Sequence, residues 1–234
     1  MLVRLDSTQL TVTEAPLAFA ERHADAIAAH WNRRVAAQPR LWNGPQFLFT
    51  DVRVHGGVLH GTAHRTDYAA FLFWRDHRRD GSAVHITGAS LGVTTDGAII
   101  AARMADHTAN AGQIYFPAGS LDPGDVAGGR IDITGNIRRE LAEETGLEPP
   151  LADFDPAMVA ASIDHAWYVA RRCRLALSFA ECEARVRAHQ AATGDDELAE
   201  LIAIRSRDDT DRLRPYARAL ALWHFDDVER GEGR

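Results

Sequence analysis

Hydrophobic residues recur at two different spacings along the chain, and the spacing predicts where helices and strands lie. Residues 16–39 carry apolar side chains at helical spacing. Residues 47–66 alternate apolar and polar side chains around Gly56-Gly57, which is typical of a β-hairpin. A second helix should follow, with Thr66 or Asp67 as its N-cap. The first third of the chain is therefore predicted to form a helix, a hairpin and a helix.

Beyond residue 83 the pattern becomes richer in strands. A hairpin is expected around Thr95-Asp96-Gly97, then a short strand that runs into a Gly/Pro/Asp-rich loop at 117–129. The helix after this loop should start near Thr134 or Asn136 and end at Gly146. The later elements are one or two strands within 158–179, a helix at 179–193 stopped by Gly194, a strand at 197–206, and a helix at 210–225 that Pro215 shortens or bends. This order predicts an α+β fold with a mixed sheet between helices.

Composition narrows the class of protein. Hydrophobic residues make up 46% of the 234 residues, enough for a sizeable core. The net charge of −7 disfavours a general nucleic-acid binder, which needs a basic face. There is no apolar run of membrane-spanning length, and MLVRLDSTQL lacks the apolar core of a signal peptide. The only cysteines, Cys173 and Cys182, suggest no disulfide framework. We expect a cytoplasmic protein without nucleic-acid or membrane partners; its oligomeric state stays open, a homodimer included.

One helical stretch concentrates acidic residues. In RRELAEETGL, Glu140, Glu143 and Glu144 fall at i, i+3 and i+4, so they project to one face and repel each other. Such a face is either solvated or occupied by a cation. It follows Pro117-Ala118-Gly119, where a glycine lets the backbone approach a ligand. Carboxylates without nearby His or Cys suit Mg²⁺ or Mn²⁺ rather than zinc.

This stretch resembles the second half of the Nudix box, the signature of the Nudix hydrolases. Arg139, Glu140, Leu141, Glu143, Glu144, Gly146 and Leu147 fill that half. Gly119 fills the first position of the signature, and an acid follows at the expected distance, as Asp125 rather than glutamate. Thirteen residues separate Asp125 from Arg139, where the family pattern has seven. The extra residues lie in the loop before the helix, where insertions are tolerated. The box arginine could be braced by Asp125 or by Asp132.

The resemblance implies a Nudix α/β/α sandwich and a set of catalytic and metal-binding residues. It implies that Arg139 and the three glutamates carry catalysis, and that Glu140, Glu143 and Glu144 bind Mg²⁺, or Mn²⁺, with the backbone carbonyl of Ala118. A further carboxylate often comes from a distant loop, and Glu197 is chosen here ahead of Asp196 and Glu200.

Two residues are candidates for contact with the substrate. Gly119 would bring the backbone against it. Arg103, at the end of a predicted strand, either faces the substrate phosphates or is an ordinary surface charge.

The N-terminal third resembles a subgroup of the family. Trp42, Asn43, Gly44, Pro45, Tyr68 and Phe71 are similar to the N-terminal extension of the atypical Nudix group that includes the animal UDP-glucose and UDP-galactose hydrolase. We therefore expect an extension at 1–83 and a Nudix domain at 84–234. The implied activity is Mg²⁺-dependent hydrolysis of a nucleoside diphosphate sugar such as UDP-glucose, to UMP and a sugar 1-phosphate. The alternatives are hydrolysis of ADP-ribose, coenzyme A or another nucleotide, and a non-catalytic nucleotide-binding module.

Overall fold

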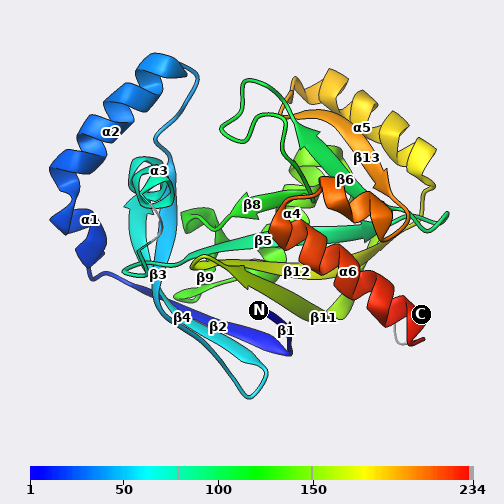
Figure 1. Cartoon of the computed structure of the whole chain (residues 1–234), viewed down its shortest axis with the longest axis horizontal. Coiled ribbons are helices and arrows are strands. Elements are labelled where there is room, and N and C mark those ends of the chain that lie inside the picture. The colour runs from blue at the N-terminus through cyan, green and yellow to red at the C-terminus, as the bar shows by residue number, and fades with distance from the viewer. Residues whose placement is uncertain (78–79, 149, 232–234) are drawn as a thin grey trace.

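The computed structural model describes residues 1–77, 80–148 and 150–231, and its elements form two mixed sheets with helices against them (Figure 1). The predicted α+β class is confirmed. Residues 78–79 of the predicted extension, and residues 149 and 232–234 of the predicted Nudix domain, lie outside the described residues. The boundary at residue 83 stays a prediction.

The larger sheet has eight strands. Its main path runs β1-β11-β12-β5-β6-β13, with the short strands β7 on β6 and β8 on β5. Only β12 and β5 pair in parallel, with Trp167 beside Ile86; the other pairs are antiparallel. The strand bounds are β1 Leu2–Leu5, β5 His85–Val93, β6 Ile99–Met104, β7 Ile114–Tyr115, β8 Ala118–Ser120, β11 Ala152–Ile163, β12 Ala166–Leu175 and β13 Leu198–Ile204.

Helices cover both faces of this sheet. In Figure 1, α6 (Pro215–Glu229) crosses the front of the sheet, whereas α4 (Ile133–Thr145) lies behind it. The fifth helix, α5 (Phe179–Thr193), packs beside α4. One continuous core joins them, with Leu141, Cys182 and Leu220 fully buried. The predicted arrangement of a mixed sheet between helices is therefore confirmed.

The smaller sheet has the order β3-β4-β2-β10-β9. The predicted hairpin of β3 (Pro45–His55) and β4 (Val58–Asp67) forms one side of this sheet, with β3 at the edge. The hairpin turns at Gly56 and Gly57, both with positive φ. The loop inserted before α4 supplies β9 (Val126–Ala127) and β10 (Arg130–Ile131), and β2 (Ser7–Thr13) joins them to β4. The inserted loop is thus tied to the N-terminal part of the chain.

Three further helices pack near the hairpin: α1 (Ala18–Arg22), α2 (Ala24–Ala37) and α3 (Tyr68–Asp76). The prediction of a single helix at 16–39 is wrong. The backbone leaves helical geometry at His23 (φ −110°, ψ 16°), so two helices form where one was predicted. Asp67 caps α3 by accepting a hydrogen bond from the Ala70 N–H, which decides between the two predicted caps.

The predicted helix ends agree with the structure. Gly146 and Gly194 end α4 and α5 in the left-handed conformation, as expected. Helix α4 starts at Ile133, one residue before the predicted Thr134, and the Asp132 side chain caps it by accepting a hydrogen bond from the Gly135 N–H. Pro215 shortens the last predicted helix: α6 begins at this proline, since a proline at the first helical position loses no hydrogen bond.

Candidate functional site

The predicted loop and helix lie against each other. Strand β8 carries Ala118 and Gly119 past α4, and Glu140 of that helix lies directly over Gly119. A Cβ atom added at residue 119 would lie 1.9 Å from Cδ of Glu140, so any side chain there would collide with the carboxylate. The glycine is needed for space, since its φ is not positive. This contact fixes the first box glutamate beside the strand end.

Arg139 is held by acids on two elements. Its Nη2 donates to Oδ1 of Asp125 at 3.1 Å and lies 2.8 Å from Glu140, while its Nη1 donates to Glu143 at 2.9 Å. Partial burial opposes the arginine's charge, but Glu140, Asp125 and Glu143 outweigh it and raise its pKa. Asp125 is therefore the residue that braces Arg139. The other aspartate considered, Asp132, caps α4 instead.

The three box glutamates have different surroundings. Glu144 is buried, with 8% of its surface exposed, and its Oε2 has no hydrogen-bond partner among the described residues. The Glu140 side chain is mostly buried, with 15% exposed, whereas 58% of the Glu143 side chain is exposed in its pair with Arg139. Glu140 and Glu144 line a cavity of about 460 Å³ together with Ala118 and Gly119. Glu143 is not part of that lining.

Burial of Glu140 and Glu144 disfavours their charge. Desolvation raises the pKa of Glu144 well above its usual value, and the negative charges of Glu140 and Glu197 add to the effect. Desolvation also raises the pKa of Glu140, to about 7, although Arg139 opposes the shift. The cavity wall therefore holds acidic groups whose negative charge the described protein does not neutralise fully.

The carboxylates predicted from a distant loop also differ in whether they reach the cavity. Glu197 and Asp196 line the cavity and are both exposed. Partial desolvation and Asp195 raise the pKa of Glu197. Glu200 lies away from the cavity, where its carboxylate accepts a 2.6 Å hydrogen bond from Nε of Arg103. Arg103 does not line this cavity, nor the second cavity described below, and stays in its surface pair with Glu200. The structure therefore brings Glu197, but neither Glu200 nor Arg103, to the cavity of the box glutamates.

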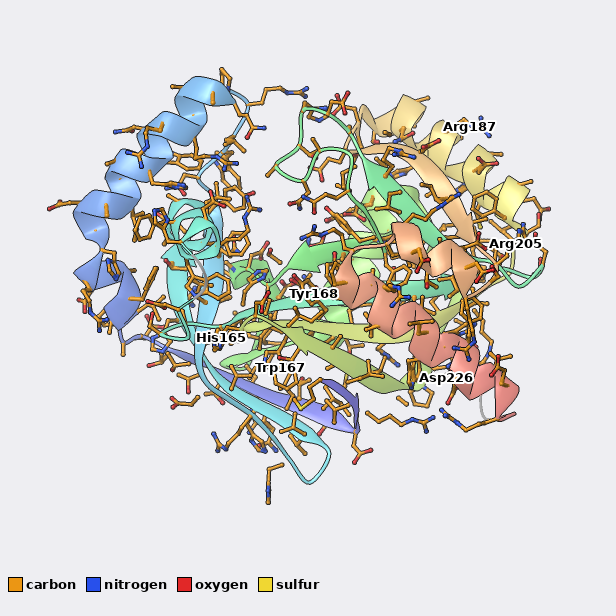
Figure 2. All side chains as sticks on the ribbon, in the orientation of Figure 1. His165, Trp167, Tyr168, Arg187, Arg205 and Asp226 are labelled. Atoms are coloured by element: carbon orange, nitrogen blue, oxygen red, sulfur yellow. The ribbon has the colours of Figure 1, made fainter. Side chains whose placement is uncertain are left out.

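A second cavity, of about 390 Å³, adjoins the first. The two share six lining residues: Tyr68, Ala109, Asn110, Tyr115, Ala118 and Ser120. The second contains Arg75 and Arg214 and no acidic residue. Tyr168, labelled near the centre of Figure 2, stacks on Tyr216 of α6 with ring centroids 3.5 Å apart. The cleft as a whole is acidic at one end, and basic and aromatic at the other.

Sequence reasoning did not find this basic end. Arg75 comes from α3, Tyr168 from β12, and Arg214 and Tyr216 from the start of α6. These residues are far apart in the chain and share no motif, so only the fold brings them together.

The side chains do not enclose an ion as they lie. Within residues 1–77, 80–148 and 150–231, no three His, Cys, Asp or Glu side chains meet closely enough to do so. Arg139 contributes to this, because Glu140 turns toward its guanidinium. A cation would have to compete with Arg139 for Glu140. The same described part of the chain contains no helix both long and apolar enough to cross a membrane.

Comparison with known proteins gives likenesses of fold. No protein-family model and no curated protein matches the sequence. The crystal structure of a Nudix hydrolase from M. smegmatis, RenU, is 16% identical over 66% of this chain and 92% of its own, with a TM-score of 0.42. The MutT protein from Methanosarcina mazei Go1 is 18% identical over 64% of this chain and 96% of its own, with a TM-score of 0.39.

A third similar structure is the NUDIX domain of Shewanella oneidensis NrtR complexed with ADP ribose. It is 13% identical over 62% of this chain and 88% of its own, with a TM-score of 0.42. At this level of similarity, the function has to be judged from the residues of the site.

Proposed function

We propose that the chain is a Nudix-type hydrolase, which cleaves the diphosphate bond of a nucleoside diphosphate derivative with the help of a divalent cation. The observation that carries this proposal is the buried Glu144, whose Oε2 has no partner among the described residues. It lies in a cavity with Glu140 and Glu197. A buried carboxylate without a counter-charge is unfavourable unless a ligand supplies one.

The donor set fits Mg²⁺ or Mn²⁺. Glu140, Glu144, Glu197 and the Ala118 carbonyl are all oxygen donors at one cavity, and hard divalent cations prefer oxygen. We propose these residues as the ligands, with Glu143 as a further ligand reached from the rim. When bound, the cation neutralises phosphate charge and activates water. Arg139, braced by Asp125, keeps Glu140 and Glu143 in place.

For the substrate, we propose a nucleoside diphosphate sugar such as UDP-glucose. The region 1–83 supports this, because Arg40, Trp42 and Tyr68 of the predicted extension line the acidic cavity. We retain 84–234 as the Nudix domain and Gly119 as a backbone contact. Arg103, paired with Glu200 outside both cavities, is not proposed as a phosphate contact. Hydrolysis of ADP-ribose, coenzyme A or another nucleotide is the alternative within the same chemistry. The cytoplasmic location and the absence of a nucleic-acid partner stay predictions.

The test is a substrate panel. Purified protein is incubated with Mg²⁺ and UDP-glucose, ADP-ribose, NADH, a dinucleoside polyphosphate or coenzyme A, and the products are separated by chromatography. We expect UMP and glucose 1-phosphate from UDP-glucose, and no product when EDTA replaces Mg²⁺. Turnover of another substrate but of no UDP-sugar would reject the nucleotide-sugar assignment. Binding of these compounds without any turnover would favour the non-catalytic module.

A further inference from the structure

Trp42 is an exposed aromatic residue at the edge of the cleft. It exposes 75% of its surface, whereas Trp74 exposes 1% and Trp167 7%. It lines the acidic cavity together with Glu140 and Glu144. It also lines a smaller hollow of about 240 Å³ next to it. An indole exposed to this degree does not contribute to the core, so its place beside the proposed reaction centre needs another explanation.

The backbone under Trp42 is firmly held. The Asn43 side chain accepts a 2.7 Å hydrogen bond from the Ala69 N–H and donates a 2.9 Å hydrogen bond to Asp67. The Tyr68 N–H donates to the Gly44 carbonyl at 2.9 Å. These bonds tie the segment to the start of α3. The exposed ring therefore projects from an ordered turn.

Gly44 determines where the indole lies. A Cβ atom at this position would be 2.2 Å from Cζ3 and 2.6 Å from Cε3 of Trp42, so the six-membered ring rests against the glycine. Gly44 does not have a positive φ, and its backbone conformation is open to other residues. The need for glycine comes from the ring itself. The turn thus holds one part of the indole against backbone and leaves the rest exposed.

The two ends of the cleft suit different parts of a nucleotide sugar. The far end carries the guanidinium groups of Arg75 and Arg214 and the amide of Gln113, which can hydrogen-bond to sugar hydroxyls. Its Tyr168 and Tyr216 rings stack on each other. The Trp42 end offers a flat apolar ring, and nucleobases stack on such rings whatever their hydrogen-bonding edge. With the diphosphate at Glu140 and Glu144, the base would lie over Trp42.

We propose that Trp42 is the stacking platform for the nucleobase of the substrate, and that Gly44 is the positioning residue that sets the angle of the indole. This inference rests on the proposed function for the location of the diphosphate, but base stacking does not require hydrolysis. It predicts that Trp42 contributes to the affinity for the nucleobase and does not contribute to the affinity for the sugar phosphate.

The decisive experiment measures binding of products, which contain no diphosphate bond to cleave. UMP, AMP and glucose 1-phosphate are titrated into the protein with Mg²⁺ by calorimetry, for wild type, Trp42→Ala and Trp42→Phe. We expect Trp42→Ala to weaken UMP and AMP roughly tenfold to a hundredfold. Trp42→Phe should recover most of the affinity, and glucose 1-phosphate should be unaffected. Trp223→Phe, a change on α6 outside the residues lining the cleft, is the matched control and should bind all three like wild type.

Gly44→Ala tests the positioning role. It should weaken UMP about as much as Trp42→Ala, and it should add little to Trp42→Ala in the double variant, because the ring it displaces is already gone. If a UDP-sugar is hydrolysed, KM should rise in these variants with little change in kcat. Additive effects of the two changes would remove Gly44 from the proposal.

Three results would overturn the stacking role: no binding of UMP or AMP to wild type, unchanged UMP affinity in Trp42→Ala, or a loss confined to glucose 1-phosphate. A change in oligomeric state with unchanged UMP affinity would place Trp42 in an interface instead. Nucleotide binding that depends on Trp42, in a protein that hydrolyses no substrate, would reject the hydrolase and leave the platform standing.

Discussion

Asp227 and Glu144 are both carboxylates with less than a tenth of their surface exposed, at 3% and 8%, yet their surroundings are opposite. Asp227, on α6, accepts a 2.6 Å hydrogen bond from the buried Arg172 and forms a second ion pair with Arg4. Glu144, on α4, has acidic neighbours in Glu140 and Glu197, and its Oε2 has no partner among the described residues.

On the proposed function, the difference separates a structural charge from one that binds a cation. A buried carboxylate paired within the chain stabilises the fold relative to its broken pair, and it has no need of a ligand. A buried carboxylate next to other acids is unfavourable unless a ligand supplies a counter-charge. The fold neutralises Asp227 internally, and we propose that a cation neutralises Glu144.

Glu144→Gln should have the largest effect on activity. The amide keeps the shape of the side chain but removes the charge that would bind the cation. We expect turnover of the substrate found in the panel to fall about a thousandfold, roughly 4 kcal/mol of barrier. Circular dichroism should show an unchanged fold. Near-normal turnover would remove Glu144 from the site.

Glu143→Gln is the matched control, since it makes the same change one residue earlier on the same helix. Its carboxylate is exposed and paired with Arg139. We expect a smaller loss of turnover than at Glu144. An equal loss would mean that Glu143 contacts the cation as closely as Glu144 does.

Asp227→Asn should act on stability and leave catalysis alone. It removes the partner of a buried arginine, and breaking such a pair costs about 3–5 kcal/mol of unfolding free energy. Urea denaturation would measure this loss. The unfolding free energy of Glu144→Gln should be measured in the same way, without metal, for comparison. The Glu144 variant should lose little or gain, because it removes an uncompensated acid. A similar loss in both variants would contradict the contrast.

A third prediction concerns the stability of the fold at low pH. Burial lowers the pKa of His224 to about 4, and the charge of Arg172 adds to the shift while Asp227 opposes it. The unfolded chain takes up a proton near pH 6.5 that the folded chain refuses, so stability should fall as pH drops from 6.5 to 4. The full effect is about 3 kcal/mol. Urea denaturation at pH 7, 5.5 and 4.5 should show a shallower fall in His224→Phe than in wild type, and equal slopes would exclude His224 as the cause.

Much of the fold could be predicted from local patterns. The β3–β4 hairpin, the end of α4 at Gly146 and the end of α5 at Gly194 follow from glycines and spacing within a few residues. No element was assigned to residues 1–15, where β1 and β2 lie. Each has only one fully buried side chain, Leu5 or Leu10, and their partners β11, β4 and β10 are far along the chain. Such strands exist through pairing, which a local pattern does not show.

In the site too, local spacing predicted some features, and others depend on contacts between distant segments. The spacing of Glu140, Glu143 and Glu144 predicted one acidic helix face. Which of them enters the cavity depends on Arg139, which pairs with the exposed Glu143, and on the space that Gly119 leaves for Glu140. The basic end of the cleft, with Arg75 and Arg214, comes from α3 and from the start of α6. Those contributions depend on tertiary packing, so no local sequence motif predicts them.

The smallest expected effect is the sharpest test of the contrast, because it needs no substrate. Mg²⁺ or Mn²⁺ should raise the Tm of wild type, since a ligand that binds only the folded state stabilises it by about 2.7 kcal/mol at a hundredfold excess over Kd. Glu144→Gln should lose most of this increase. Asp227→Asn should start from a lower Tm and show the full increase, because its defect lies in a pair that no metal replaces. Thermal unfolding of the three proteins, with and without cation, would separate the two kinds of buried acid, and equal shifts in all three would show that the cation binds elsewhere.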